Sequence, residues 1–498
     1  AFRTINVRPY VVILFKDKTA RTSTAEGSNP TWNEQLQIPI NFKLDQLKGS
    51  LCIQLFDEFV DDLLEDDRLG MSEIYQRISR KWIGELRIPI TSIYTNQRIE
   101  GTFELNSPKI LLGYSKSSLN PGTVSIFTEN LPDTRGPIYL SLFIGLEPNF
   151  DQPYFTTKYL DCMESDQIKG TIQIWSMEYS NEFPHRFSDL LVTLTTGKRV
   201  TITKLLGALE VPFDVREASR ECLIRRFVSL IPVLQTTDPL GQLNGVWLTN
   251  NEILTHMYAT PKDLAVLLTC YYMYLDFSVW LVFGEDRVVG PTCYVLIKEN
   301  GNFYLVDPVS GRKYSSSDTY CPLVKVSLLA NQSNVWGNIQ SEKRVYLTQF
   351  DVKKSVDWRP LFRKNVDIPG DFLQDTTFEY KRTYPVSDLQ KVIEMKLMKK
   401  ISQWRGHRKT IWNRFLRDQL KSVLIELEAA TTSELSASGF PLNIPYYSLS
   451  HIVERVKSTG LHMNMDNRVE FALAVHIHPY ENNVLSVWIF LLSLLPRV

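Results

Sequence analysis

The residues that suggest chemistry lie at positions 291–311, PTCYVLIKENGNFYLVDPVSG. Alternating apolar residues on both sides of a turn at 299–302 predict a hairpin, and its second strand ends at Asp307. A carboxylate at such a strand end can orient an imidazole, which in turn takes the proton of a nucleophilic thiol. Catalysis of this kind therefore requires a cysteine and a histidine beside Asp307.

The hairpin and the preceding run TPKDLAVLLTC are similar to the transglutaminase-like core. In that family a cysteine opens a helix shortly before Asp-Phe-Ala, a strand carries His-Ala-Trp, and the paired strand ends in Asp-Pro. Aligned on 263–265 and on Tyr294, the resemblance puts Pro261 at the cysteine position and Thr292 at the histidine position, and it retains Asp307. Proline cannot attack and threonine cannot serve as a base near neutral pH. We expect an inactive domain whose peptide cleft persists as a groove for an extended segment.

Cys293 and Cys270 are the thiols that could replace the missing nucleophile. Strand alternation is expected to point Cys293 to the face opposite Thr292. Cys270 follows Pro261 by two helical turns among apolar residues, so it is interpreted as a small buried hydrophobe. His256 is the imidazole near them in the sequence. A thiol-dependent hydrolase or acyl transferase that uses Cys293 stays open as an alternative.

The first 147 residues have the pattern of a β-sandwich, with the strand-like runs YVVILF, QLQIPI, LCIQLF, WIGELRIPI, TFELN and IYLSLFIGL. The run TAEGSNPTWNEQLQIPI, and DDRLG followed by WIGELRIPI, resemble C2 domains. From this resemblance we expect a C2-like sandwich whose first strand is missing.

C2 domains that bind calcium place aspartates on two loops at one tip, because Ca²⁺ takes about 6–8 oxygen ligands. Here Arg8 stands at the first acidic position, and the second reads Asp57-Glu58-Phe59 in place of Asp-x-Asp. We therefore expect no calcium site. A nearby acidic loop is interpreted as solvated; it contains Asp61, Asp62, Glu65, Asp66 and Asp67.

His476 and His478 are spaced to share one face of a strand and could be metal ligands. No third ligand is visible nearby, so we predict partly buried polar residues and no metal site.

A basic cluster on predicted amphipathic helices fits an acidic groove or an anionic membrane, although a solvated helix face is the simpler interpretation. Its candidate interaction surface consists of Lys396, Lys399, Lys400, Arg405, Arg408 and Lys409, and the wider cluster adds His407, Arg414 and Arg417.

The chain divides into four parts by its patterns. We predict a multidomain protein with an all-β C2-like sandwich at 1–147, a connector with some helix at 148–198, and an inactive α/β (α+β) transglutaminase-like, papain-type domain at 199–345. Residues 346–498 form a mixed C-terminal segment with a long helix from Ser387, a second helix after Gly406 that includes Trp412, and a terminal hairpin with its turn at 479–483. Ser387 and Gln390 predict a capping box. We expect this segment to pack on the transglutaminase-like domain.

Composition limits the classes of function. The 498 residues exceed one core, and 55 Lys and Arg against 55 Asp and Glu give no overall field toward nucleic acid. Six cysteines without a CxxC pair indicate free thiols in a reducing compartment. No signal peptide is recognised, and the strongest apolar run, at 484–495, is shorter than the roughly 20 residues that cross a bilayer.

The order of these parts resembles the coiled-coil and C2 domain-containing 2 family, with the 2B branch favoured over 2A. The resemblance covers essentially the whole chain and is carried by TAEGSNPTWNE, LLGYSK, GFPLNIPYY and VEFALAVHIHPYENNVLSVWIF. It implies a non-enzymatic scaffold in the cytoplasm at the ciliary base, which supports cilium assembly through contacts with other transition-zone proteins. No cofactor, nucleic acid or small-molecule substrate is implied. Calcium-independent binding to a membrane surface stays open.

Overall fold

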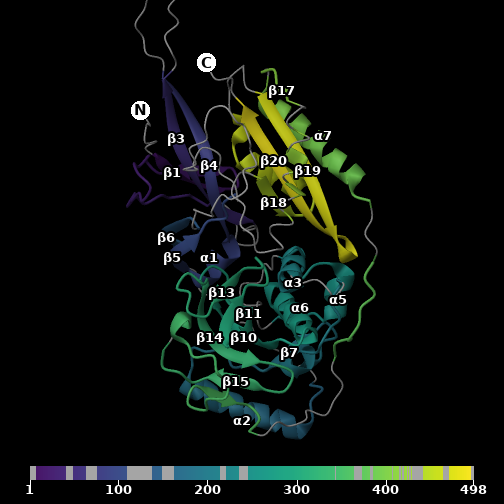
Figure 1. Ribbon diagram of the computed structural model, residues 1–498. Coiled ribbons are helices and arrows are strands. Elements are labelled where there is room, and N and C mark those ends of the chain that lie inside the picture. Colours follow the sequence, from purple (N-terminus) through teal and green to yellow (C-terminus); the bar gives the residue numbers. More distant parts are fainter. Residues whose placement is uncertain are drawn as a thin grey trace, which may run out of the picture.

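The chain folds into three lobes that meet along their sides, as the computed structural model in Figure 1 shows. The structure describes residues 7–40, 49–62, 76–108, 137–148, 162–213, 220–234, 245–342, 344–363, 373–381, 385–406, 408–413, 417, 420–422, 424–425, 428, 441–463 and 470–494. The described helices include none with the length and apolar character needed to cross a bilayer.

The N-terminal lobe contains a four-stranded antiparallel sheet with the order β2-β1-β3-β4 and a separate pair β5-β6. Because side chains alternate along a strand, Val11 and Leu55 face the interior of the lobe while Tyr10 and Phe56 stack on the other face. The elements are β1 (Pro9–Phe15), β2 (Lys18–Arg21), β3 (Ser50–Asp62), β4 (Gln76–Pro89), α1 (Ile90–Asn96), β5 (Arg98–Glu104) and β6 (Tyr139–Gly145). The all-β C2-like sandwich is thus present.

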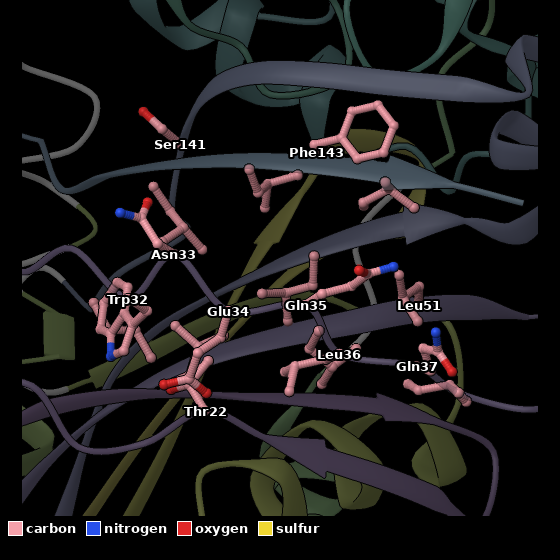
Figure 2. A pocket seen from close by; sticks show the side chains of 18 of the residues that line it. Thr22, Trp32, Asn33, Glu34, Gln35, Leu36, Gln37, Leu51, Ser141 and Phe143 are labelled. Carbon is pink, nitrogen blue, oxygen red and sulfur yellow. The ribbon is translucent and has the colours of Figure 1, made fainter.

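One predicted strand of this lobe is wrong. Residues 35–40 keep the alternating burial of a strand, with Leu36 and Ile38 turned inward, but they form no ladder with another strand. Instead they run along an apolar cavity of about 2060 Å³ that β1, β3 and β6 also line, as Figure 2 shows for Leu36 and Leu51. The alternating burial was thus predicted correctly, but no strand pairing forms at these residues.

The central lobe is built on a seven-stranded sheet with the order β13-β12-β11-β10-β14-β15-β16, all antiparallel neighbours. Helix α6 packs on β10 and β11, and a small sheet β8-β7-β9 lies beside it. The elements are α2 (Asp166–Glu182), β7 (Leu191–Leu194), β8 (Arg199–Thr201), α3 (Arg220–Ser229), β9 (Val246–Trp247), α5 (Asn250–His256), α6 (Pro261–Tyr274), β10 (Ser278–Asp286), β11 (Gly290–Glu299), β12 (Asn302–Val306), β13 (Lys313–Ser315), β14 (Leu323–Ala330), β15 (Val335–Asn338) and β16 (Trp358–Pro360). The predicted hairpin is β11–β12, and the mixed α/β architecture agrees with the prediction.

Part of the predicted connector at 148–198 belongs to the core of the central lobe. In α2, Trp175 and Tyr179 are buried, and both lie against Gly337 of β15. The Tyr179 hydroxyl lies 2.8 Å from the carbonyl oxygen of Ser327 and 2.9 Å from that of Asn338. The helix therefore closes one side of the sheet. At the other boundary, the sheet continues past 345 to β16.

The C-terminal lobe has a four-stranded sheet with the order β17-β19-β20-β18, which includes the predicted terminal hairpin β19–β20. Two predictions here are wrong: Trp412 lies in strand β17, parallel to β19, and α7 begins with Val386 as its cap residue and lacks the capping box of Ser387 and Gln390. The elements are α7 (Ser387–Trp404), β17 (Ile411–Trp412), β18 (Pro441–Pro445), α9 (Leu449–Ser458), β19 (Glu470–Tyr480) and β20 (Val484–Leu494).

The C-terminal lobe contacts both other lobes, although we expected it to pack on the transglutaminase-like domain. Toward the central lobe, Arg226 of α3 makes hydrogen bonds of 3.0–3.1 Å to both oxygens of Glu428. Toward the N-terminal lobe, Arg455 of α9 pairs with the buried Glu85 of β4. Around these pairs, apolar side chains such as Trp82 join the core of the C-terminal lobe.

Gly284 and Gly170 allow a test of packing in the central lobe. A Cβ added to Gly284 of β10 would lie 2.4 Å from the carbonyl oxygen of Lys325, whereas one at Gly170 of α2 would meet nothing within 4 Å. We predict that Gly284→Ala lowers the free energy of unfolding by about 1–3 kcal/mol through overpacking. Gly170→Ala, the matched control, should raise it by up to about 1 kcal/mol through helix propensity. Chemical denaturation measures both, and equal effects of the two substitutions would contradict this packing.

Candidate degenerate active site

Helix α6 begins at Pro261, the position that the resemblance aligns with a nucleophilic cysteine. Asp263 caps the helix: its carboxylate accepts hydrogen bonds from the Thr260 hydroxyl at 2.5 Å and from the Leu248 amide at 3.1 Å. Lys262 is 3% exposed, and its ammonium lies 4.9 Å from the ring centre of Trp247. The space at the start of the helix is therefore filled by side chains and closed to solvent.

Strand β11 turns Cys293, and not Thr292, toward α6. Cys293 is 1% exposed and packs in the same apolar cluster as α6 and Phe283, its partner on β10. Thr292 shares the opposite face with Tyr294, which belongs to a different cluster. Cys293 and Thr292 thus lie on opposite faces of the strand, as strand alternation predicts, and Cys293 is the one that faces α6.

Asp307 is engaged in its own turn. Its carboxylate accepts hydrogen bonds from the Val309 amide at 2.9 Å and the Ser310 hydroxyl at 2.6 Å, and the turn continues with a bond from the Gly311 amide to the Asp307 carbonyl. The Asp-Pro sequence thus shapes the exit of the hairpin. The structure does not bring Pro261, Thr292 and Asp307 together as a relay.

A second buried carboxylate lies on the same side of the sheet as Asp307. Asp286 accepts a hydrogen bond from the Tyr294 hydroxyl at 2.8 Å and from the amides of Val288 and Val289 at 2.7 and 3.0 Å. Burial raises the pKa of Asp286 to about 6, although these hydrogen bonds oppose the shift, and the negative charge of Asp307 adds to it. Protonation of Asp286 therefore begins at a higher pH than for an exposed aspartate.

The other thiols and imidazoles do not rebuild the missing pair. Burial raises the pKa of Cys270 to about 11 and that of Cys293 further, although the charge of Lys262 opposes the latter shift. His256 stacks on Tyr258, with ring centres 5.6 Å apart. None of the six cysteines forms a disulfide, and Cys52, Cys270, Cys293 and Cys321 are buried.

The tip of the N-terminal lobe uses its acids for structure. Asp57 is fully buried and accepts a hydrogen bond from the Arg8 amide at 2.8 Å. Glu58 lies 2.9 Å from the guanidinium of Arg21 and 3.6 Å from that of Arg8. Both carboxylates are thus committed to β1 and β2. Glu65, Asp66 and Asp67 of the acidic loop lie outside the described residues, as do the side chains of Asp61 and Asp62, and the described part of the chain contains no group of three potential metal ligands.

His476 and His478 share one face of β19, as predicted, with ring centres 6.5 Å apart. Burial lowers the pKa of His476, and the neighbouring His478 lowers it further. His478 packs edge to face against Tyr480. The pair fits the interpretation of partly buried polar residues.

The predicted basic surface is only partly a surface. Lys396 and Lys399 of α7 are exposed, as are Arg408 and Lys409, and Lys400 is half-buried. Arg405 is 3% exposed and lies over the ring of Phe471 at 4.8 Å, so its inclusion in an exposed surface is wrong. Arg417 lies 3.5 Å from Glu394, and His407 and Arg414 lie outside the described residues.

The sequence analysis did not predict which side chains surround Pro261 at the start of α6. Lys262 was a visible signal, since it and Asp263 are the charged residues of the otherwise apolar helix α6. Trp247 comes from a two-residue strand with no periodicity of its own. The buried partners Arg226 and Glu428 lie 202 residues apart, and nothing in their local sequence pairs them.

Asp286→Asn should flatten one part of the pH dependence of stability. Because the folded pKa is raised to about 6, Asp286 stabilises the fold fully below its unfolded pKa of about 4, and this contribution is lost as the pH rises to about 6. The neutral amide mimics the protonated acid, so we expect the variant to lose about 1–3 kcal/mol less than the wild type over this window. Urea denaturation across the window measures the difference. Glu285→Gln, at the more exposed neighbour, is the control, and parallel curves for wild type and Asp286→Asn would rule out the raised pKa.

Comparison with known proteins agrees with this architecture. A C2 domain model matches residues 3–105, and a CEP76 peptidase-like domain model matches residues 245–361. The chain is 36% identical to Coiled-coil and C2 domain-containing protein 2A of Drosophila melanogaster in an alignment of 520 positions, gaps included. It is 29% identical to Protein CC2D2B of Homo sapiens in an alignment of 523 positions.

These alignments cover 99% and 98% of this chain but only 38% and 36% of the two relatives. The chain thus spans less than two fifths of their length. The preference for the 2B branch stays a prediction, since the 2A protein is the more similar of the two. With both domains in the same order and homology over nearly its whole length, the chain belongs to the coiled-coil and C2 domain-containing 2 family.

Proposed function

We propose that this chain is a non-enzymatic scaffold at the base of the cilium, in the transition zone, that supports cilium assembly through contacts with other transition-zone proteins. Membership of the family supports the ciliary role. The packed state of the former catalytic position supports the non-enzymatic one. Because the chain covers only part of the length of its relatives, the proposal concerns what this region contributes to such an assembly.

The observation that carries the proposal is the filling of the space at the start of α6. A nucleophilic cysteine needs a lowered pKa, partial exposure and a base within hydrogen-bond reach. Pro261 supplies no nucleophile, and Lys262 and Cys293 are both buried there. Burial also raises the pKa of Cys293, which disfavours the thiolate.

The burial of these positions also bears on the peptide groove that the resemblance suggests. Lys262, Asp263 and Cys293 are each at most 3% exposed, so a peptide could not reach the old catalytic position without displacing them. We therefore propose that partners bind to the outer surfaces of the lobes.

A thiol hydrolase or acyl transferase remains the second candidate, because Cys293 does face α6. If the protein is a scaffold, a thiol alkylating probe should react with the native protein at the partly exposed Cys162 and Cys222. It should react much more slowly at the buried Cys270 and Cys293. Mass spectrometry of labelled peptides measures the order, and unfolding in urea should make all sites equal. Fast labelling at Cys293 in the native protein, lost in Cys293→Ala, would overturn the scaffold proposal.

The ciliary role is tested by complementation. In ciliated cells that lack the protein, a gene carrying Cys293→Ala should restore cilia as well as the wild-type gene does, because a scaffold needs no thiol at this position. A gene carrying Glu428→Ala should restore fewer, since Arg226 would lose its carboxylate partner and keep only its hydrogen bonds to Asn443 and Ser486, which should destabilise the contact between lobes by up to about 3–5 kcal/mol. The outcomes are measured by counting cilia and by locating the protein with immunofluorescence. If the Cys293→Ala gene does not restore cilia, catalysis by this thiol is favoured. If cells that lack the protein form normal cilia, the ciliary role is contradicted.

A further inference from the structure

Helix α2 presents an apolar stripe to solvent. Its opposite side packs in the core through Ile172, Trp175 and Tyr179. On the outer side, Ile174 and Met177 are 60% and 62% exposed and lie three residues apart, which places them next to each other on one face. We call this pair, with the exposed Gln173 and Glu178 beside it, the α2 face.

Helix α7 presents a second stripe of the same kind. Its buried side consists of Ile393, Leu397 and Ile401. On the outer side, Val392 and Met395 are 44% and 62% exposed, again three residues apart. The exposed lysines Lys391, Lys396 and Lys399 border this pair, and together these five residues form the α7 face.

The two faces match in spacing and are opposite in charge. The α2 face reads Ile174, Met177 and Glu178, and the α7 face has the same spacing in Val392, Met395 and Lys396. Within the described part of the chain, neither Glu178 nor Lys396 takes part in an ion pair, so both charges remain available to a partner. Apolar surface beside an opposite charge is what each face would recognise in the other.

The two faces cannot meet within one copy of the chain. Figure 1 shows α2 at one end of the molecule, on the central lobe, and α7 at the other end, on the C-terminal lobe. The α7 face of one copy could therefore meet the α2 face of a second copy. Because this contact joins two different surfaces, it is heterologous, and repeated contacts give either a closed ring or an open chain of copies.

We propose that copies of this chain associate end to end, with the α7 face of one copy against the α2 face of the next. The apolar part of each stripe is roughly 5 Å long, and the polar and charged residues extend it to roughly 8 Å on α2 and roughly 12 Å on α7, so the contact is small. We expect a weak association, with a Kd on the order of 10–100 µM, that weakens further as salt screens the exposed charges. The inference does not depend on the ciliary role.

The test reverses the charge of each face separately. One variant carries Lys396→Glu and Lys399→Glu, and the other carries Gln173→Lys and Glu178→Lys. Sedimentation velocity at concentrations that bracket the expected Kd should show association of the wild type, and a weakening by at least about tenfold in each variant alone. A control with Lys353→Glu and Lys354→Glu, which makes the same charge change as the α7 variant on an exposed turn, should associate like the wild type.

Mixing the two variants separates an effect on the contact from an effect on folding. Each variant offers faces that match those of the other, so an equal mixture should regain association close to that of the wild type. A wild type that stays monomeric at all concentrations would overturn the proposal, and so would a mixture that stays monomeric. Binding of the α7 face to vesicles that contain phosphatidylserine, with a monomeric wild type, would assign that face to lipid and likewise overturn it.

Discussion

Two buried carboxylates hold the C-terminal lobe against the other two lobes, and the arrangement of the molecule depends on them. Glu428 accepts hydrogen bonds from Arg226, from the Tyr480 hydroxyl at 2.7 Å and from the Ser486 hydroxyl at 2.8 Å. Burial opposes its ionisation, but the guanidinium and these donors hold the pKa of Glu428 down to about 2. Because a buried charge that loses its partner costs several kcal/mol, each lobe is stable in its observed position only while its partner is present.

In the central lobe, packing and capping determine the side chains at the start of α6. Proline is well suited to the first turn of a helix, where its missing amide donor is not needed. Asp263 then caps α6, and Cys293 packs as a small apolar residue between helix and sheet. These residues stabilise the contact between α6 and the sheet.

Features that depend on neighbouring residues in the sequence were predicted well, and features that depend on contacts between distant segments were not. The hairpin β11–β12, the buried helix α6 and the terminal hairpin β19–β20 depend on local periodicity, and they are confirmed. Residues 35–40 have the right alternation, but whether a strand forms depends on a neighbour that only the fold supplies. Strand alternation predicts that Cys293 and Thr292 point to opposite faces of β11, but which of them faces α6 depends on the packing of the whole sheet.

The burial of basic residues was the least predictable property, because a basic side chain can either pack in a core or lie on the surface. Arg405 and Lys396 stand nine positions apart in one basic run, yet Arg405 is buried over the ring of Phe471 while Lys396 is exposed beside Met395. The helical period decides between them only once the packed side of α7 is known. The exposed lysines of α7 lie on the side of the helix away from the core of their lobe. The helical period thus separates the side chains that stabilise the lobe from those that remain on its surface.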